Sequence, residues 1–184
     1  MKKIIIILFI LLNLKGYSQD TTFYITDKKD VIWKKVFTTN MSYNELLLQI
    51  KKTGNFSNID TASNTILGEI KRMPIDYSSG KETIWKSNIP LYIKMSDISA
   101  TFELNYKIGK YQVIIRNINC IGKADNPTNN MMFLKPNELD PLKNYALKTN
   151  KLEINKQFLK NSVPIFDFTF NNLFSINENK INNW

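Results

Sequence analysis

The side chains that could perform acid–base or nucleophilic chemistry in this chain are few. The sequence has no histidine and a single cysteine, Cys120. A Ser-His-Asp triad is therefore impossible, and a nucleophilic cysteine would lack the histidine base that usually activates it. Zinc and transition-metal sites lose their usual imidazole and thiolate ligands for the same reason. We expect Cys120, at the end of a predicted strand, to be a buried thiol with no internal disulfide partner.

Carboxylate pairs remain as the one route to general acid–base catalysis. The candidates are Glu69 on a predicted strand, Asp76 in a predicted loop and Glu103 on a predicted hairpin. Glu103 alternates with apolar residues, so we expect it on the outer face of a sheet, paired across strands with a lysine. The acidic residues lack the spacing of a calcium loop, and the scattered glycines form no phosphate-binding loop. We therefore expect no enzyme, cofactor or metal site, and a carboxylate-dependent hydrolase is the least favoured alternative.

Aromatic side chains are the other residues that could form a site. They could line a surface for a carbohydrate or a hydrophobic ligand, although such residues more often pack in cores or at edges. A long helix lying over a curved sheet can leave a cavity for a hydrophobic small molecule, as in helix-grip folds. The candidates for a cavity wall or an interaction surface are Trp33, Trp85, Phe102, Tyr106, Tyr111, Phe166 and Phe170.

A β-hairpin over residues 100–120 is the predicted centre of that sheet. Apolar and polar residues alternate along both arms, which is typical of strands with one face in a core. Pairing Tyr106 with Tyr111 places the alternating apolar residues of both arms on one face. On the same pattern, Ile114 and Ile118 lie on the opposite face.

Two loops fit this register. One has two residues, Ile108-Gly109, and the other has four, residues 107–110. A two-residue type I′ turn needs a positive φ at both central positions, which a β-branched isoleucine resists. We therefore predict the longer loop, with Gly109 taking the positive φ.

The elements before the hairpin predict an α+β fold. Val31–Phe37 has the pattern of a first strand, and Ser42 and Glu45 form a capping box before a helix over residues 43–53. One strand, one helix and about five further strands are typical of an antiparallel sheet with helices on one face. The further strands before the hairpin are predicted at residues 56–59, 65–71 and 91–95.

The last third of the chain is predicted to be a polar connection followed by a helix. Residues 123–136 are rich in turn-forming residues, and residues 138–148 suggest a short helix interrupted near Pro141. Phe166, Phe168 and Phe170 alternate as in a strand, but a longer set recurs at helical spacing, so we predict a helix over residues 163–179 with Ser162 as N-cap. The helical stripe comprises Leu159, Val163, Phe166, Phe170 and Leu173.

The N-terminus has the features of a secretory signal peptide. Lys2 and Lys3 precede an unbroken apolar run, residues 4–12, and small residues around Ser18 predict cleavage that leaves Gln19 first. Nine apolar residues are far fewer than the roughly 20 needed to span a bilayer. We expect an exported chain, periplasmic or extracellular, without a transmembrane segment.

This organisation predicts four segments. They are a signal peptide over residues 1–18, a flexible lead-in over 19–30, an α+β sheet domain over 31–122, and a connection with a helical segment over 123–184 that packs on the same domain.

The positive charge of the chain does not by itself indicate an anionic partner. The formal charge is +9, and removing the three lysines of the predicted signal peptide leaves about +6. Arginine occurs only at Arg72 and Arg116, and no arginine-rich or lysine–aromatic cluster appears. We interpret the lysines as solvated and expect no nucleic-acid partner.

Several of these segments together resemble a known family. The run VIWKKVF, the helix after Ser42, the segment FSNIDTASNTILGEIK and the hairpin TFELNYKIGKYQVIIRNI are similar to secreted Bacteroidetes proteins of the domain-of-unknown-function family 4468. The resemblance covers Val31 to Gly122, and its most specific part is Lys107-Ile108-Gly109-Lys110-Tyr111. The family usually has aspartate where this chain has Ile108. The resemblance implies a TATA-binding-protein-like fold, with a curved antiparallel sheet and helices on one face, and it implies no activity.

The sequence therefore favours an exported, non-catalytic binding or interaction module of the cell envelope. Its partner would be an unidentified envelope protein. The alternative is a carrier of a hydrophobic small molecule held between the sheet and the C-terminal helix.

Overall fold

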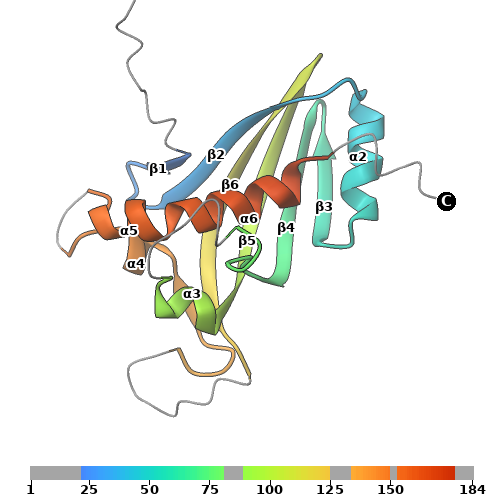
Figure 1. Cartoon of the computed structure of the whole chain (residues 1–184). Coiled ribbons are helices and arrows are strands. Elements are labelled where there is room, and N and C mark those ends of the chain that lie inside the picture. The colour runs from blue at the N-terminus through green and yellow to red at the C-terminus, as the bar shows by residue number, and fades with distance from the viewer. Residues whose placement is uncertain (1–21, 81–88, 125–133, 150–152, 177–184) are drawn as a thin grey trace, which may run out of the picture.

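An open antiparallel sheet is the framework of the molecule (Figure 1). The computed structural model describes residues 22–80, 89–124, 134–149 and 153–176, and all statements on structure concern these ranges. Seven strands form the sheet in the order β1-β2-β6-β5-β4-β3, with β7 paired to β6. The strands are β1 Phe23–Ile25, β2 Val31–Thr38, β3 Phe56–Ala62, β4 Thr65–Pro74, β5 Ser96–Lys107, β6 Lys110–Gly122 and β7 Leu139–Pro141.

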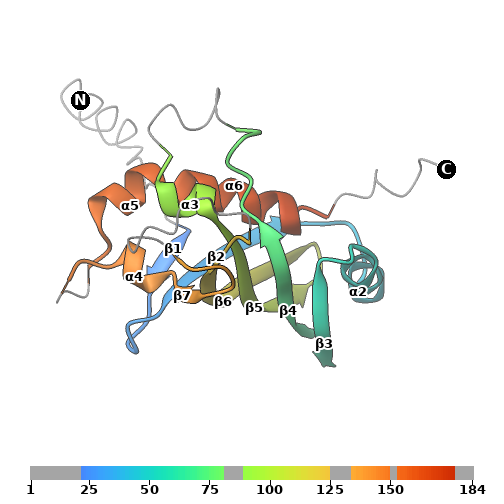
Figure 2. The ribbon, with the colours of Figure 1, turned by 90° about the horizontal axis from the view of Figure 1, so that it is seen from below.

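Helices cover one face of this sheet, which we call the inner face. Seen from below, α3, α5 and α6 lie together on that face, and α2 lies beside β3 at the far edge (Figure 2). The expected α+β class, with an antiparallel sheet and a C-terminal helix packed on it, is confirmed. The helices are α2 Tyr43–Lys52, α3 Leu91–Met95, α4 Lys143–Ala146, α5 Lys156–Asn161 and α6 Val163–Phe174.

The central hairpin has the predicted register but not the predicted loop. Tyr106 pairs with Tyr111, and the pairing continues to Lys107 and Lys110, so the loop has two residues, Ile108 and Gly109. The preference for four residues was wrong because it assumed a type I′ turn. Gly109 takes the positive φ, +81°, and Ile108 is not among the residues with a positive φ. The turn therefore avoids the strain that a β-branched residue would suffer there.

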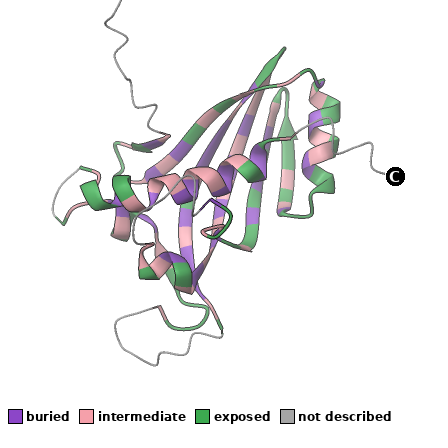
Figure 3. Cartoon of the chain, in the orientation of Figure 1, coloured by how far each residue is buried: buried purple, intermediate pink, exposed green. Residues whose placement is uncertain are grey.

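Burial alternates along the strands as the period-two pattern predicts (Figure 3). Phe102 and Leu104 of β5 and Val113 and Ile115 of β6 point into the core on the inner face. A β-bulge interrupts this alternation in β6, where Asn117 has a φ of +50° and the register with β5 shifts. Ile118 was predicted to face away from the core, and this prediction was wrong. The extra residue of the bulge turns its side chain inward, where it is buried.

Gly68 of β4 is needed for the packing of Phe102 on the neighbouring strand. The two residues are cross-strand partners, and a Cβ built on Gly68 would lie 2.6 Å from Cε1 of the Phe102 ring. Phe102 in turn lies in edge-to-face contact with Phe174 of α6, with ring centroids 5.4 Å apart. The absence of a side chain at Gly68 thus lets an aromatic residue fill the space between sheet and helix.

Two predictions for shorter elements were wrong: residues 91–95 are not a strand, and residues 139–141 of the predicted helix over 138–148 form the strand β7. Residues 91–95 form the single-turn helix α3, in which the Pro90 carbonyl accepts a hydrogen bond from the Ile93 N–H at 3.1 Å. Ile93 is buried while Leu91 is exposed. Three alternating residues fit one helical turn as well as a short strand, so the pattern could not separate the two.

Part of the segment predicted as a flexible lead-in forms the strand β1, which pairs with β2. Phe23 is buried and lies in edge-to-face contact with Phe158 of α5, with ring centroids 5.6 Å apart, and with Phe166 of α6 at 6.2 Å.

The C-terminal helix begins at Val163, as predicted, and the described helix ends at Phe174. Residues 177–179 of the predicted span lie outside the described residues. Ser162 is in the N-cap position but its side chain forms no cap hydrogen bond, since its backbone is helical (φ −107°, ψ −42°) rather than extended. Its hydroxyl instead accepts a hydrogen bond from the Tyr92 hydroxyl at 2.8 Å. Leu159, expected on the same apolar stripe, is on α5 and exposed.

Within the described part of the chain, none of the helices has the length and apolarity that crossing a bilayer would take.

Candidate binding site at the edge of strand β2

The predicted aromatic residues are mostly in the core rather than on the surface. Trp33 contacts Phe170 with ring centroids 5.4 Å apart, and Phe170 stacks on Phe166 at 6.1 Å. These rings lie in contact with one another between the sheet and α6. Five of the seven candidates are buried: Trp33, Phe102, Tyr111, Phe166 and Phe170.

The other two candidates lie elsewhere. Tyr106 is half-buried, and its hydroxyl donates a hydrogen bond to the Met41 carbonyl at 2.9 Å. Trp85 lies outside the described residues. A ligand-binding role for any of the seven stays a prediction.

The three candidate carboxylates do not converge. The Glu103 carboxylate is paired with the Arg116 guanidinium at 3.4 Å, so its cross-strand partner is an arginine and not the predicted lysine. Glu69 accepts a hydrogen bond from Asn58 at 2.9 Å on the far edge of the sheet. Asp76 accepts one from the Ser79 N–H at 3.0 Å in a loop. The described ranges contain no group of three or more His, Cys, Asp or Glu side chains that could hold a metal ion.

Cys120 is a buried thiol, as predicted. Burial raises its pKa to about 12, while a hydrogen bond with Ser96 acts in the opposite direction and the charge of Asp140 adds to the increase. Burial likewise raises the pKa of the hydroxyl of Tyr92, which stacks on Tyr145 with ring centroids 4.0 Å apart. Because these groups hold their protons at neutral pH, they provide neither a nucleophile nor a general base.

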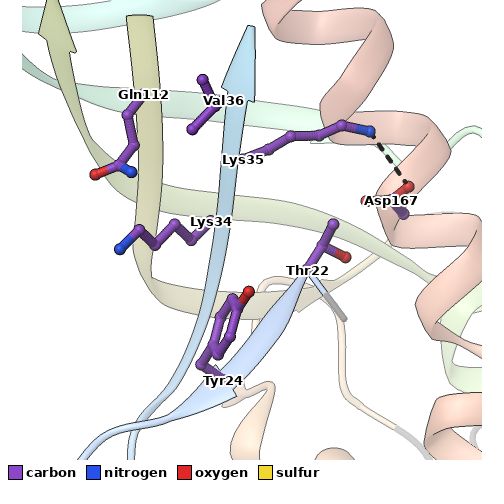
Figure 4. A pocket seen from close by; sticks show the side chains of 7 residues that line it. All are labelled: Thr22, Tyr24, Lys34, Lys35, Val36, Gln112 and Asp167. Atoms are coloured by element: carbon purple, nitrogen blue, oxygen red, sulfur yellow. Dashed lines mark ion pairs between the residues drawn. The ribbon is translucent and has the colours of Figure 1, made fainter. Parts of the chain in front are cut away.

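An open groove lies where β1 ends and no described residue pairs with that side of β2 (Figure 4). Its volume is about 350 Å³, and we call it the β2 edge groove. Its lining residues come from β2, β6 and α6, and from β1 and the residue before it. The groove is lined by Thr22, Tyr24, Lys34, Lys35, Val36, Gln112 and Asp167.

Beyond Lys34, no described residue pairs with the backbone of β2 on the side of this groove. β1 pairs with Val31–Trp33, and the last bond on that side runs from the Lys34 N–H to the Thr22 carbonyl at 2.8 Å. In an antiparallel strand successive residues direct their N–H and C=O groups to alternate sides. The N–H and C=O of Val36 therefore point in the same direction as those of Lys34, into the groove. The Val36 side chain is 52% exposed.

The charges of the groove are divided between the two faces of β2. On the inner side, Asp167 accepts a hydrogen bond from the Trp33 indole N–H at 2.9 Å, and the Lys35 ammonium lies 3.9 Å from its carboxylate. On the other side of the strand, Lys34 points away from Asp167, toward the side of Gln112 (Figure 4). Among the described residues, Lys34 has no ion pair. The groove therefore combines open backbone groups with one unneutralised ammonium.

The sequence patterns did not indicate this groove. The adjacent lysines Lys34 and Lys35 were visible within a predicted strand, but the open edge depends on where β1 stops. Asp167 reaches Trp33 across 134 residues of sequence, a contact that no local pattern encodes.

A second groove of about 280 Å³ lies between the ends of α2 and α6. It has neither a charged side chain nor an open strand edge, so it offers fewer means of recognition than the β2 edge groove. Its lining residues are Gln49, Thr53, Asn55, Asn172, Leu173, Ser175 and Ile176.

Comparison with known proteins gave matches only among solved structures. No protein-family model matches the chain, and a search of curated proteins found no match. A TBP-like protein from Parabacteroides distasonis ATCC 8503 is similar over 83% of this chain and 92% of its own, at 13% identity and a TM-score of 0.44. A DUF4468 family protein from Bacteroides ovatus ATCC 8483 is similar over 86% of this chain and 94% of its own, at 14% identity and a TM-score of 0.45. The family that the hairpin segment resembles is thus also the one named for the second structure. Both structures are described by fold or family, without an activity.

Proposed function

We propose that the chain is an exported, non-catalytic binding module of the bacterial cell envelope that holds a partner at the β2 edge groove. The observation that carries this proposal is the edge of β2, where the Val36 backbone faces the groove beside Lys34 and neither is paired on that side by a described residue. Such an arrangement offers directional hydrogen bonds and a charge to a partner.

Export is supported by the N-terminal sequence. A short positive region, an apolar run over residues 4–12 and small residues near Ser18 have the order that a signal peptidase recognises. We expect the mature chain to begin at Gln19.

The structure supports the two alternative functions less well. A carrier of a hydrophobic molecule needs room between the sheet and α6, where the rings of Phe102, Phe166 and Phe170 are buried and Phe166 stacks on Phe170. A carboxylate-dependent hydrolase needs two convergent carboxylates, whereas Glu69 and Glu103 each have a different partner on the outer face of the sheet.

The proposal is tested by site-specific photo-crosslinking in the native host. A photoreactive phenylalanine analogue is placed at Tyr24 in the groove or, as a matched control, at Leu48 on α2. The two side chains are similarly exposed, at 45% and 50%. We expect a discrete covalent adduct from Tyr24, absent from Leu48, in an exported chain beginning at Gln19. Equal adduct patterns at both positions, or a chain retained in the cytoplasm, would contradict the proposal.

A further inference from the structure

We infer that the β2 edge groove takes an extended segment of a partner protein, which adds as a short strand beside β2 and carries an acidic side chain, an inference that rests on the proposed function. Strand addition of this kind derives affinity from main-chain hydrogen bonds and specificity from alternate side chains. The open part of β2 has the form that this mode of binding requires.

The first reason is the length and direction of the open edge. β1 ends opposite Trp33, and the last described bond on that side of β2 joins the Lys34 N–H to the Thr22 carbonyl at 2.8 Å. Beyond this bond, Val36 directs both backbone groups away from β6, to a side where no described residue pairs with it. A partner residue opposite Val36 can therefore form both hydrogen bonds of a narrow antiparallel pair, with one flanking residue on each side.

The second reason is the position of the charge. Lys34 and Val36 are two residues apart on one strand, so their side chains share a face. A partner residue opposite Val36 has its side chain on that face, diagonal to Lys34 at about 7–8 Å between Cα positions, within reach of a lysine side chain. An aspartate or glutamate at this position would neutralise the ammonium, which has no ion pair within the described ranges.

The third reason is the residue on the opposite face. In the partner strand, the residue adjacent to the one opposite Val36 is opposite Phe37, and its side chain points to the inner face. The Phe37 ring stacks on Tyr111 with centroids 5.2 Å apart. Phe37 is only half-buried and packs against the core. The partner segment should therefore have an apolar residue next to its acidic one.

The same charges disfavour a second copy of this chain as the occupant. Pairing the β2 edges of two copies would bring Lys34 and Lys35 of both onto one short ladder. Lysines on an edge strand are a common means of preventing such pairing. A partner segment with an acidic residue satisfies the edge without this repulsion.

The test uses the mature chain and a synthetic peptide of about eight residues, in which valines and threonines flank a central aspartate. Amide hydrogen exchange measured by NMR reports directly on the edge. In the free protein we expect the Val36 amide to exchange rapidly and the Lys35 amide, which points to β6, to be protected. The peptide should slow exchange at Val36 and leave Lys35 unchanged.

Two comparisons between matched peptides test the predicted ion pair with Lys34 and the predicted main-chain hydrogen bond with Val36. Replacing the aspartate of the peptide with asparagine should weaken binding about two- to five-fold, and Lys34→Gln should remove this difference between the peptides. Methylating the peptide nitrogen that faces the Val36 carbonyl should abolish binding, whereas methylating the next nitrogen, which faces solvent, should not.

Three outcomes would overturn the inference. One is peptide binding without protection of Val36, and another is equal binding of the aspartate and asparagine peptides. The third is protection of Val36 in the free chain, because residues before Thr22 would then occupy the edge. If a photo-crosslink forms at Tyr24 but no peptide of this type binds, the partner class is wrong and the proposed binding function stands.

Discussion

Cys120 illustrates at the scale of single residues how the fold sets the chemistry of a side chain. It lies opposite Ile98 on the inner face of the sheet, and both side chains are buried. Burial raises the pKa of the thiol to about 12, from an ordinary value of 9.0. The folded chain therefore keeps this proton over a pH range in which the unfolded chain releases it.

This difference predicts how stability depends on pH. Above pH 9 the unfolded state binds fewer protons at Cys120 than the folded state, so the free energy of unfolding should fall as pH rises toward 12. The slope from this one group is on the order of 1.4 kcal/mol per pH unit. Urea unfolding at a series of pH values from neutral upward measures it. Cys120→Ala, which has no thiol, should lack this part of the slope, and parallel curves for the two proteins would contradict the assignment.

The candidate aromatic residues show what residue-level patterns could predict. Alternation and helical spacing identified Phe102, Tyr111, Phe166 and Phe170 as members of one apolar region, and the structure buries all four. The patterns could not separate a filled core from a cavity wall, because the same side chains line both. The ring-to-ring contacts, such as Phe166 with Phe170, are visible only in the tertiary structure.

At the scale of elements, helix α2 shows how completely a local signal can define a boundary. The Ser42 hydroxyl accepts a hydrogen bond from the Glu45 N–H at 3.4 Å, and the Glu45 carboxylate accepts one from the Ser42 N–H at 2.7 Å. This is the predicted capping box, and the hydrogen bond with the Ser42 backbone lowers the pKa of Glu45. The helix then buries Leu46 and Ile50 on the core.

Removing the cap should destabilise the protein by a modest amount. Ser42→Ala leaves the first turn of α2 with an unsatisfied N–H and should lower the free energy of unfolding by about 1 kcal/mol. Ser42→Asp keeps a side-chain acceptor at the same position and serves as the control. Chemical denaturation monitored by circular dichroism compares the two. A loss in the aspartate variant equal to that in the alanine variant would show that the cap is not responsible.

Other elements depended on contacts that no short window of sequence contains. The bulge at Asn117 is a change of register between β5 and β6, and α3 is a single turn held by the burial of Ile93. A stretch of three to five residues is compatible with more than one backbone conformation, and the tertiary contacts select between them.

At the scale of the whole molecule, α6 holds the sheet and the N-terminal strands together. Phe170 is fully buried between Trp33 of β2 and Phe166 of the same helix. The Tyr111 hydroxyl donates a hydrogen bond to the Phe174 carbonyl at 2.6 Å, which anchors the end of the helix to β6. One helix thus closes the core and carries Asp167 to the β2 edge groove.

Removing a large side chain from the centre of this core should strongly destabilise the protein. Phe170→Ala removes the ring between Trp33 and Phe166 and should lower the free energy of unfolding by about 3–5 kcal/mol. Leu159→Ala, on the exposed side of α5, should change it by no more than about 0.5 kcal/mol. Both are measured by urea denaturation. If Phe170→Ala leaves the free energy of unfolding unchanged and the protein binds an apolar small molecule in native mass spectrometry, the carrier function would be favoured.

The sequence by itself determined the local features of this protein: the central hairpin register, the capping box of α2 and the helical nature of residues 163–174. These depend on periodicity, turn residues and capping groups within a few positions of one another. The tertiary structure alone decided that the aromatic rings of the sheet and α6 pack on one another, that β1 stops opposite Trp33 and that Asp167 meets Trp33 across 134 residues. An open strand edge is defined by which neighbour is missing, and that depends on how distant segments pack, not on the residues of the edge itself.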